Sequence, residues 1–276
     1  MKATTLIIDL LRTYQERGAD VKTIMDTGKL FDYSENLMRV SLSRLVNKEI
    51  VVKLQRGQYR LSNTTNPINE FAERWRLGED RCKPWPEDSW ICVHIPLALD
   101  KRSRWVLNIN GLRQVSDKLW TRPDNLNLIN TESFLIKMGL TENIIFISSA
   151  SLSEKVKNQW FEQFDTRTLD QEYLDMQSKL TKSLDRLNTL PLHQAKKESF
   201  HLGGAAIALL ANDPLIPIKR HSPKNRIKLW KTLKTYDQRG RYIWSLSSLS
   251  RPNTTPTSGL AAMSGLTKMQ TTQEAM

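Results

Sequence analysis

The sequence predicts an α+β protein with more than one domain, and three observations lead to this prediction. In residues 1–65, segments with the apolar spacing of helices precede two short segments that alternate like strands. Strand-like and helix-like segments alternate between residues 90 and 148. From residue 153 the spacing is helical, and residues 169–190 contain neither Gly nor Pro. A chain of 276 residues is long enough for two or three domains.

The first predicted domain, residues 1–65, begins with two short helices. Residues 6–14 place their apolar side chains on one face, and Gly18 can end this first helix. A second helix is expected over Val21–Asp26, with Thr27 and Gly28 as a break before a small segment that ends at Tyr33.

The main helix of this domain is predicted over residues 35–47. Ser34 is a suitable N-cap, because its hydroxyl can accept a hydrogen bond from a backbone N–H of the first turn. Apolar residues at helical spacing form one stripe, which consists of Met38, Leu42, Leu45 and Val46. The opposite face carries Asn36, Val40, Ser43, Arg44 and Asn47, with Arg39 on its flank and Lys48 at its end.

A hairpin is predicted to follow the main helix. Residues 50–54 are mostly β-branched and apolar, Gln55-Arg56-Gly57 forms a turn, and residues 58–61 return as a second strand. A capped helix followed by a hairpin has the order of a winged helix-turn-helix. The expected domain is therefore an N-terminal winged helix.

Double-stranded DNA is the partner that this predicted domain favours. Short polar and guanidinium side chains can reach base edges and phosphates in a major groove. Arg44 and Asn36 are expected to contact bases, and Arg39 and Lys48 to contact phosphates. The full set of candidate DNA-binding residues is Ser34, Asn36, Arg39, Val40, Ser43, Arg44, Asn47, Lys48, Lys53 and Arg56. The alternative interpretation is a small α+β core whose basic residues form an ordinary solvated face.

The second predicted domain covers residues 89–150 and follows a linker at residues 66–88. In the linker, residues 68–75 are expected to be helical and Lys83-Pro84-Trp85-Pro86 to be a stiff connector. The domain itself is predicted as a small ferredoxin-like α+β layer. Its expected elements are a strand from Trp90, a helix over 101–113, a strand over 114–123, a helix over 131–138 and a strand over 144–148.

A helical C-terminal region is predicted over residues 151–245. Helices are expected over residues 169–190 and 195–210, and Asn212-Asp213-Pro214 stops the second of them. Residues 219–241 contain nine Lys or Arg and one Asp, and form either a phosphate-contacting arm or a solvated helix. Residues 246–276 lack periodicity and are predicted to be a disordered tail.

Charge and composition favour a polyanionic partner in a reducing compartment. The formal net charge is +12, and residues 190–276 hold 13 basic against 4 acidic residues. Cys82 and Cys92 are the only cysteines, so neither a disulfide framework nor a zinc knuckle is expected. No apolar run is long enough to span a membrane, and no signal peptide is expected. A cytoplasmic protein without membrane contact is predicted.

The sequence favours no catalytic site, cofactor or metal site. It has no P-loop, no dinucleotide fingerprint and no paired CxxC, and His193 and His201 are too far apart for the usual metal-binding pair. A rival interpretation is a nucleic-acid-processing protein whose ferredoxin-like domain is a metal-dependent nuclease; Asp100, Asp117 and Asp124 are then the nearby carboxylates. In a third interpretation, the winged helix binds another protein.

Tryptophans concentrate in and around the second domain, at positions 75, 85, 90, 105 and 120. Core packing is one explanation for them. The other is an aromatic-walled pocket for a small effector, in which Arg104 or Arg122 binds an anionic group beside Trp120. These three residues are the candidate effector site.

Three segments in order resemble the PaaX-type transcriptional regulators, the repressors of phenylacetate catabolism. Residues 34–62 resemble the winged-helix part of the family, Lys118–Leu126 its central strand motif, and Asn212–Pro217 its C-terminal helical stop. The sequence departs from the family after Pro217. The first match rests on Arg39, Leu42, Ser43, Arg44, Leu45, Gly57, Tyr59 and Leu61.

The resemblance implies a dimeric bacterial repressor with a winged helix, a ferredoxin-like middle domain similar to small CRISPR-associated nucleases, and a helical C-terminal region. It also implies release from DNA by an acyl-CoA-like small effector. The predicted function is therefore that of a homodimeric, sequence-specific regulator, most simply a repressor, bound to a palindromic operator.

Overall fold

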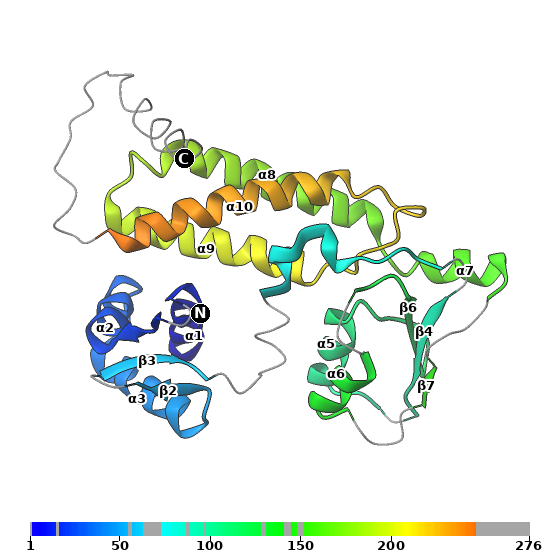
Figure 1. Cartoon of the computed structure of the whole chain (residues 1–276), viewed down its shortest axis with the longest axis horizontal. Helices are drawn as coiled ribbons and strands as arrows, with labels where there is room; N and C mark the ends of the chain where they lie inside the picture. The colour runs from blue at the N-terminus through cyan, green and yellow to red at the C-terminus, as the bar shows by residue number, and fades with distance from the viewer. Residues whose placement is uncertain are drawn as a thin grey trace, which may run out of the picture.

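The structure is a computed structural model that describes residues 2–14, 17–54, 57–62, 73–86, 89–96, 98–127, 131–140, 145–147 and 152–246. It is an α+β protein with two small antiparallel sheets. Three apolar clusters form its core, one in an N-terminal unit, one in a middle unit and one in a C-terminal helical bundle (Figure 1). The predicted tail from residue 247 and the first part of the predicted linker helix lie outside the described residues.

The N-terminal unit combines three helices with a three-stranded sheet of order β1-β3-β2. Ser34 caps α3 as predicted, because its hydroxyl accepts a hydrogen bond from the Leu37 N–H at 3.3 Å. Leu6, Leu10 and Met38 are completely buried between the helices. The elements are α1 (Ala3–Tyr14), β1 (Ala19–Asp20), α2 (Val21–Leu30), α3 (Glu35–Asn47), β2 (Val51–Lys53) and β3 (Gln58–Leu61).

The predicted break at Thr27 and Gly28 was wrong, because α2 continues through both residues to Leu30. Both lie on the buried face of α2, and a Cβ atom at Gly28 would lie only 2.4 Å from Cγ of Met38. Gly28 therefore serves the close packing of two helices here, and the helix ends at Phe31 and Asp32 instead.

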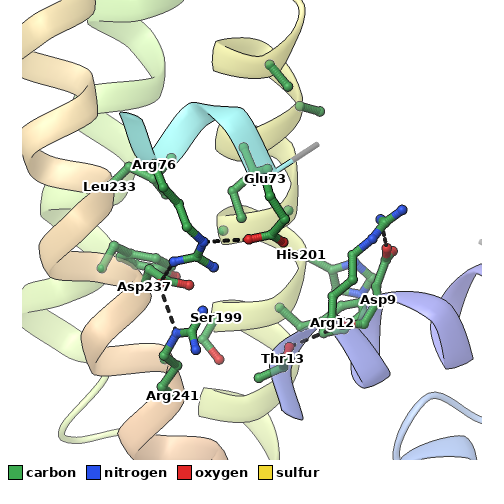
Figure 2. Close-up of a pocket in the computed structure, with 18 of the residues that line it drawn as sticks. Asp9, Arg12, Thr13, Glu73, Arg76, Ser199, His201, Leu233, Asp237 and Arg241 are labelled. Carbon is green, nitrogen blue, oxygen red and sulfur yellow. Dashed lines mark hydrogen bonds and ion pairs between the residues drawn. The ribbon is translucent and has the colours of Figure 1, made fainter. Parts of the chain in front are cut away.

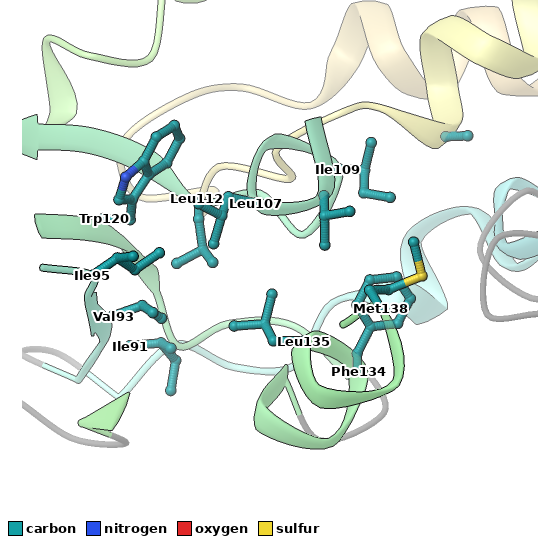
Figure 3. Close-up of a cluster of buried hydrophobic side chains, with 12 residues drawn as sticks. Ile91, Val93, Ile95, Leu107, Ile109, Leu112, Trp120, Phe134, Leu135 and Met138 are labelled. Carbon is teal, nitrogen blue, oxygen red and sulfur yellow. The ribbon is translucent and has the colours of Figure 1, made fainter. Parts of the chain in front are cut away.

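The middle unit follows the order strand, helix, strand, strand, helix, strand. Its antiparallel sheet has the strand order β5-β6-β4-β7. Both helices lie on one face of this sheet, and Figure 3 shows Val93, Leu107 and Leu135 meeting between the two layers. The elements are β4 (Trp90–His94), α5 (Lys101–Ile109), β5 (Arg113–Ser116), β6 (Leu119–Pro123), α6 (Thr131–Lys137) and β7 (Ile145–Ile147).

Two predicted boundaries in this unit were wrong. The helix predicted to reach residue 113 ends at Ile109, because Gly111 adopts a left-handed backbone with φ of 75°. The single strand predicted over 114–123 is a hairpin, in which Gln114 pairs with Trp120 and Ser116 with Leu119. Its turn contains neither Gly nor Pro, so the usual turn signal was missing from the sequence.

The C-terminal bundle consists of three long helices, α8, α9 and α10, which pack against one another. Leu180, Ala206 and Leu233 are completely buried at their common axis. No helix among the described residues is both long and apolar enough to cross a membrane. The bounds are α7 (Glu154–Phe161), α8 (Thr166–Arg186), α9 (Leu192–Ala211) and α10 (Lys224–Ser245).

A short 3₁₀ segment, η3 (Arg74–Arg81), ties the bundle to the middle unit. Glu79 accepts two hydrogen bonds from the buried Arg226 of α10, at 3.0 and 2.7 Å. Arg81 donates to the carbonyl of Leu210 at the end of α9. Asn125 of the middle unit donates to the carbonyl of Leu215 at 2.6 Å. Buried polar contacts of this kind hold the two units in a fixed relation.

Aromatic contacts and one ion pair join the N-terminal unit to the bundle. The rings of Phe31 and Phe200 lie 5.1 Å apart, and Trp244 packs on Phe200 at 5.9 Å. Lys197 pairs with Asp32 at 3.0 Å. Figure 1 places this junction beside α1 and α2, whereas α3 and β2 lie on the opposite side of the unit. The outer face of α3 is therefore clear of the bundle.

Candidate nucleic-acid interface

The outer face of α3 is a continuous exposed surface of polar and basic side chains. One face of the helix lies in the N-terminal core, so the opposite face points outward. The buried residues are Met38, Ser41, Leu42 and Leu45, and Val46 packs against the same core. The structure brings together on this face eight residues predicted from the sequence, and all are exposed: Ser34, Asn36, Arg39, Val40, Ser43, Arg44, Asn47 and Lys48.

Arg39 is held in place by an ion pair with Glu35, one helical turn earlier. Its Nη2 and Nε atoms donate to one carboxylate oxygen at 2.7 and 3.0 Å. The hydrogen bond from Arg39 holds the pKa of Glu35 below its ordinary value. Because a phosphate is also an anion, it would compete with Glu35 for this guanidinium.

The hairpin after α3 extends the exposed surface. Lys53, at the end of β2, is exposed and pairs through its backbone with Tyr59. Arg56, predicted at the tip of the hairpin, lies outside the described residues. Apart from this surface, α10 carries a separate exposed row of basic side chains at Lys224, Lys228, Lys231 and Lys234.

The arginines of the basic run have internal partners that the sequence did not reveal. Arg220 donates to Asn158 and Glu154 of α7, and Arg226 pairs with Glu79. Arg239 donates to the side chain of Asn188, and Arg241 donates to Asp237. The lysines of α10 thus face solvent, whereas these arginines are engaged with other side chains of the protein.

The expected effector site at Arg104, Trp120 and Arg122 is not formed. Trp120 is 3% exposed and belongs to the core between the sheet and the helices. Arg122 is equally buried, and donates to the Thr131 hydroxyl at 2.7 Å and to the Pro123 carbonyl at 2.9 Å; burial lowers its pKa to about 10. Arg104 lies on the surface beside Gln114. Trp120 lies in β6, a strand between β5 and β4 in which residues 120–123 are all buried.

Two of the three carboxylates of the rival interpretation have structural roles. Asp100 caps α5 by accepting a hydrogen bond from the Ser103 N–H at 2.7 Å. Asp124 pairs with Lys83 at 2.9 Å. His193 and His201 are both exposed on α9. In the part of the chain that the structure describes, no three His, Cys, Asp or Glu residues are grouped to hold a metal ion.

A cleft of about 500 Å³, here called the inter-unit cleft, lies where the N-terminal unit meets the bundle. Its walls come from α1, η3, α9 and α10, and Trp105 of α5 contributes to its lining. Figure 2 shows Asp9 and Arg12 of α1 on one side, with Arg76, Asp237 and Arg241 on the other. These residues are distant in sequence, so periodicity could not bring them together. The only local signals were Asp9 within an apolar helix and the Gly203-Gly204 pair within α9.

Burial affects the carboxyl group of Asp9, one of the three carboxylates that line this cleft. Asp9 accepts a hydrogen bond from Arg12 at 2.7 Å. Burial raises the pKa of Asp9 more strongly than the neighbouring Arg12 lowers it. On the other side, Arg76 bridges Glu73 and Asp237 at 2.6 and 3.1 Å, and Asp237 also accepts from Arg241 at 2.9 Å.

Comparison with solved structures shows a similarity of fold. No family model matches the sequence, and no curated protein matches it. The structure is similar to that of an uncharacterized protein, Rv0674, from Mycobacterium tuberculosis. The TM-score is 0.57 at 16% sequence identity, and the match covers 89% of this chain and 99% of that chain. A similarity at this identity concerns the fold alone.

Proposed function

We propose that this protein is a sequence-specific DNA-binding transcriptional regulator, and that it acts as a homodimeric repressor. The observation that carries the proposal is the outer face of α3. It presents eight exposed polar, basic or small side chains on one capped helix, turned away from the rest of the protein (Figure 1). A surface of this kind is suited to a major groove, where a helix reads base edges and contacts phosphates.

The arrangement of the N-terminal unit supports its assignment as a winged helix-turn-helix. α2 and α3 pack closely at Gly28 and Met38, and the β2–β3 hairpin follows α3 directly. A helix of 13 residues is about 20 Å long, which is sufficient to cross the major groove. Arg44 and Asn36 lie at exposed positions from which a base edge can be reached.

The middle unit is assigned to the ferredoxin-like class on its topology. Its helices and strands occur in the order β-α-β-β-α-β, and the first strand, β4, lies between β6 and β7 in an antiparallel sheet. In this proposal the middle unit and the bundle position two copies of the winged helix. One such helix reads few base pairs, so a two-fold dimer on a palindromic operator provides the specificity.

The nuclease alternative has weaker support. Among the described residues its candidate carboxylates belong to no group of three possible metal ligands, and Asp100 and Asp124 are engaged in a helix cap and an ion pair. On the α3 surface, in contrast, the side chains of Asn36, Ser43 and Asn47 are exposed, and among the described residues none of them caps a helix or forms an ion pair.

Selection of bound sequences from random duplex DNA tests the proposal. The purified full-length protein is used at about 150 mM salt, where non-specific phosphate binding is weak. An enriched inverted repeat is expected, and its half-site spacing gives the separation of the two recognition helices. Binding that lacks sequence enrichment and fades as salt rises would contradict the proposal.

A further inference from the structure

We propose that the inter-unit cleft binds an uncharged, largely apolar small molecule, and that its occupancy changes the affinity of α3 for DNA. The binding part of this inference stands on the cleft alone. The regulatory part rests on the proposed function. It differs from the acyl-CoA-like effector that the resemblance implied, because the chemistry of the lining points to an uncharged ligand.

The size and the lining of the cleft suit a small ligand. Its volume of about 500 Å³ lies within the usual range of small-molecule pockets, about 300–1,000 Å³. Along α9 the wall is formed by residues that include Gly204, Ile207 and Ala208, and a Cβ atom at Gly204 would meet no other atom within 4 Å. Trp105, which is 41% exposed, and Trp244 add aromatic surface.

The charges of the lining cancel. Three arginines and three carboxylates line the cleft, and they are paired: Arg12 with Asp9, Arg76 with Glu73 and Asp237, and Arg241 with Asp237. An anion entering the cleft would have to displace a carboxylate from its guanidinium, or be buried beside it. Either event costs free energy that an uncharged ligand avoids.

A coenzyme A thioester is a poor occupant for the same reason. Its phosphate groups carry several negative charges, and phosphate recognition requires donors with surplus positive charge. Arg12, Arg76 and Arg241 supply none, because each is already matched by a carboxylate.

The position of α1 links this cleft to the DNA-binding surface. One face of α1 carries Asp9 and Arg12 into the cleft, while its other face, with Leu6 and Leu10, packs into the core that also contains Met38 of α3. A ligand held between α1 and the bundle would therefore change how the N-terminal unit sits on α9 and α10. In a dimer this alters the separation of the two α3 helices.

Two fluorescent probes that share one skeleton test the charge preference. N-phenyl-1-naphthylamine is neutral, and 8-anilino-1-naphthalenesulfonate adds one sulfonate. The neutral probe is expected to bind the full-length protein saturably, and about tenfold more tightly than the sulfonate. Asp237→Asn removes one carboxylate and leaves the lining with surplus positive charge. It should tighten the binding of the sulfonate several-fold while leaving that of the neutral probe unchanged.

Two variants on the same helix locate the probe. Gly204→Leu fills the open wall of the cleft and is expected to lower the affinity for the neutral probe by about tenfold or more. Ala205→Leu is the matched control, because residue 205 is exposed on α9 and does not line the cleft, and it should bind the probe like the wild type. The inference would be overturned if both variants bound the neutral probe with equal affinity. It would also be overturned if the wild type bound the two probes equally tightly.

The regulatory part is measured separately, with the operator recovered by selection. Saturating neutral probe is expected to change operator affinity by about 5-fold or more in the wild type and not in Gly204→Leu. Probe binding without any change in operator affinity would refute the coupling but leave the binding site. Probe binding in a protein that selects no DNA sequence would refute the proposed function and leave the ligand site intact.

Discussion

Gly28 of α2 and Met38 of α3 are in such close contact that any larger residue at position 28 requires the Met38 side chain to move. A Cβ atom there would lie 2.4 Å from Cγ and 3.0 Å from Sδ of Met38, whose side chain is completely buried. This contact sets the distance between the two helices that precede the hairpin.

Gly28→Ala is therefore expected to destabilise the protein by about 1–3 kcal/mol, because a buried side chain must move to admit the methyl group. Chemical denaturation monitored by circular dichroism measures the loss. The matched control is Gly204→Ala, at a helical position with open space, which should gain about 0.5–1 kcal/mol. A stable Gly28→Ala variant would show that α2 and α3 are not so closely packed.

Arg44→Ala should weaken operator binding by about 1–3 kcal/mol and relax the sequence preference, since a bidentate arginine contact to a base carries both affinity and discrimination. Titration of operator and scrambled DNA by fluorescence anisotropy measures both effects. Equal affinities of wild type and variant for each DNA would remove Arg44 from the recognition surface.

The salt dependence of binding distinguishes the two basic surfaces. Arg39→Gln is expected to lower the slope of log affinity against log salt by about one, because one phosphate contact is lost. The double variant Lys228→Gln, Lys231→Gln should leave the slope unchanged, since α10 lies in the bundle, apart from α3 (Figure 1). A reduced slope in the double variant would place α10 on the DNA.

Asp9 should make stability depend on pH in a defined direction. Burial raises its folded pKa above the ordinary value of 3.8, so its contribution to stability is most favourable below that value and declines as pH rises through the folded pKa. Asp9→Asn should therefore gain stability relative to wild type as pH rises from below 3.8.

Asp20→Asn provides the contrast with the opposite sign. The hydrogen bond from the Thr23 backbone lowers the pKa of Asp20, whose contribution is present above the unfolded pKa and is lost as pH falls. This variant should lose stability relative to wild type over the same rise in pH. Urea unfolding at several pH values measures both slopes, and parallel slopes would contradict the assignment.

Trp120 should behave as a core residue. Trp120→Ala is expected to cost about 3–5 kcal/mol of folding stability, because a buried indole is removed from the sheet–helix interface. Trp120→Phe keeps part of the ring and should bind N-phenyl-1-naphthylamine as the wild type does. Loss of probe binding in a folded Trp120→Phe variant would return this residue to the ligand site.

Much of the local structure could be predicted from the sequence. The Ser34 cap, the bounds of α3 and the exposure of its polar face all follow from residues within a few turns of one another. The failures were also local in form: Gly28 looked like a helix end, and the turn between β5 and β6 contains neither Gly nor Pro. In the first case tertiary packing overrode the usual preference of the residue.

The sequence by itself determined the apolar face of the main helices, because helical periodicity indicates which positions are buried. It therefore determined the α+β class and the exposed surface of α3. Only the tertiary structure decided which elements meet. It buried Trp120, paired Arg226 with Glu79, and brought Asp9, Arg76 and Gly204 to one cleft. Periodicity along a chain contains no information about contacts between distant segments, and the cleft consists of such contacts.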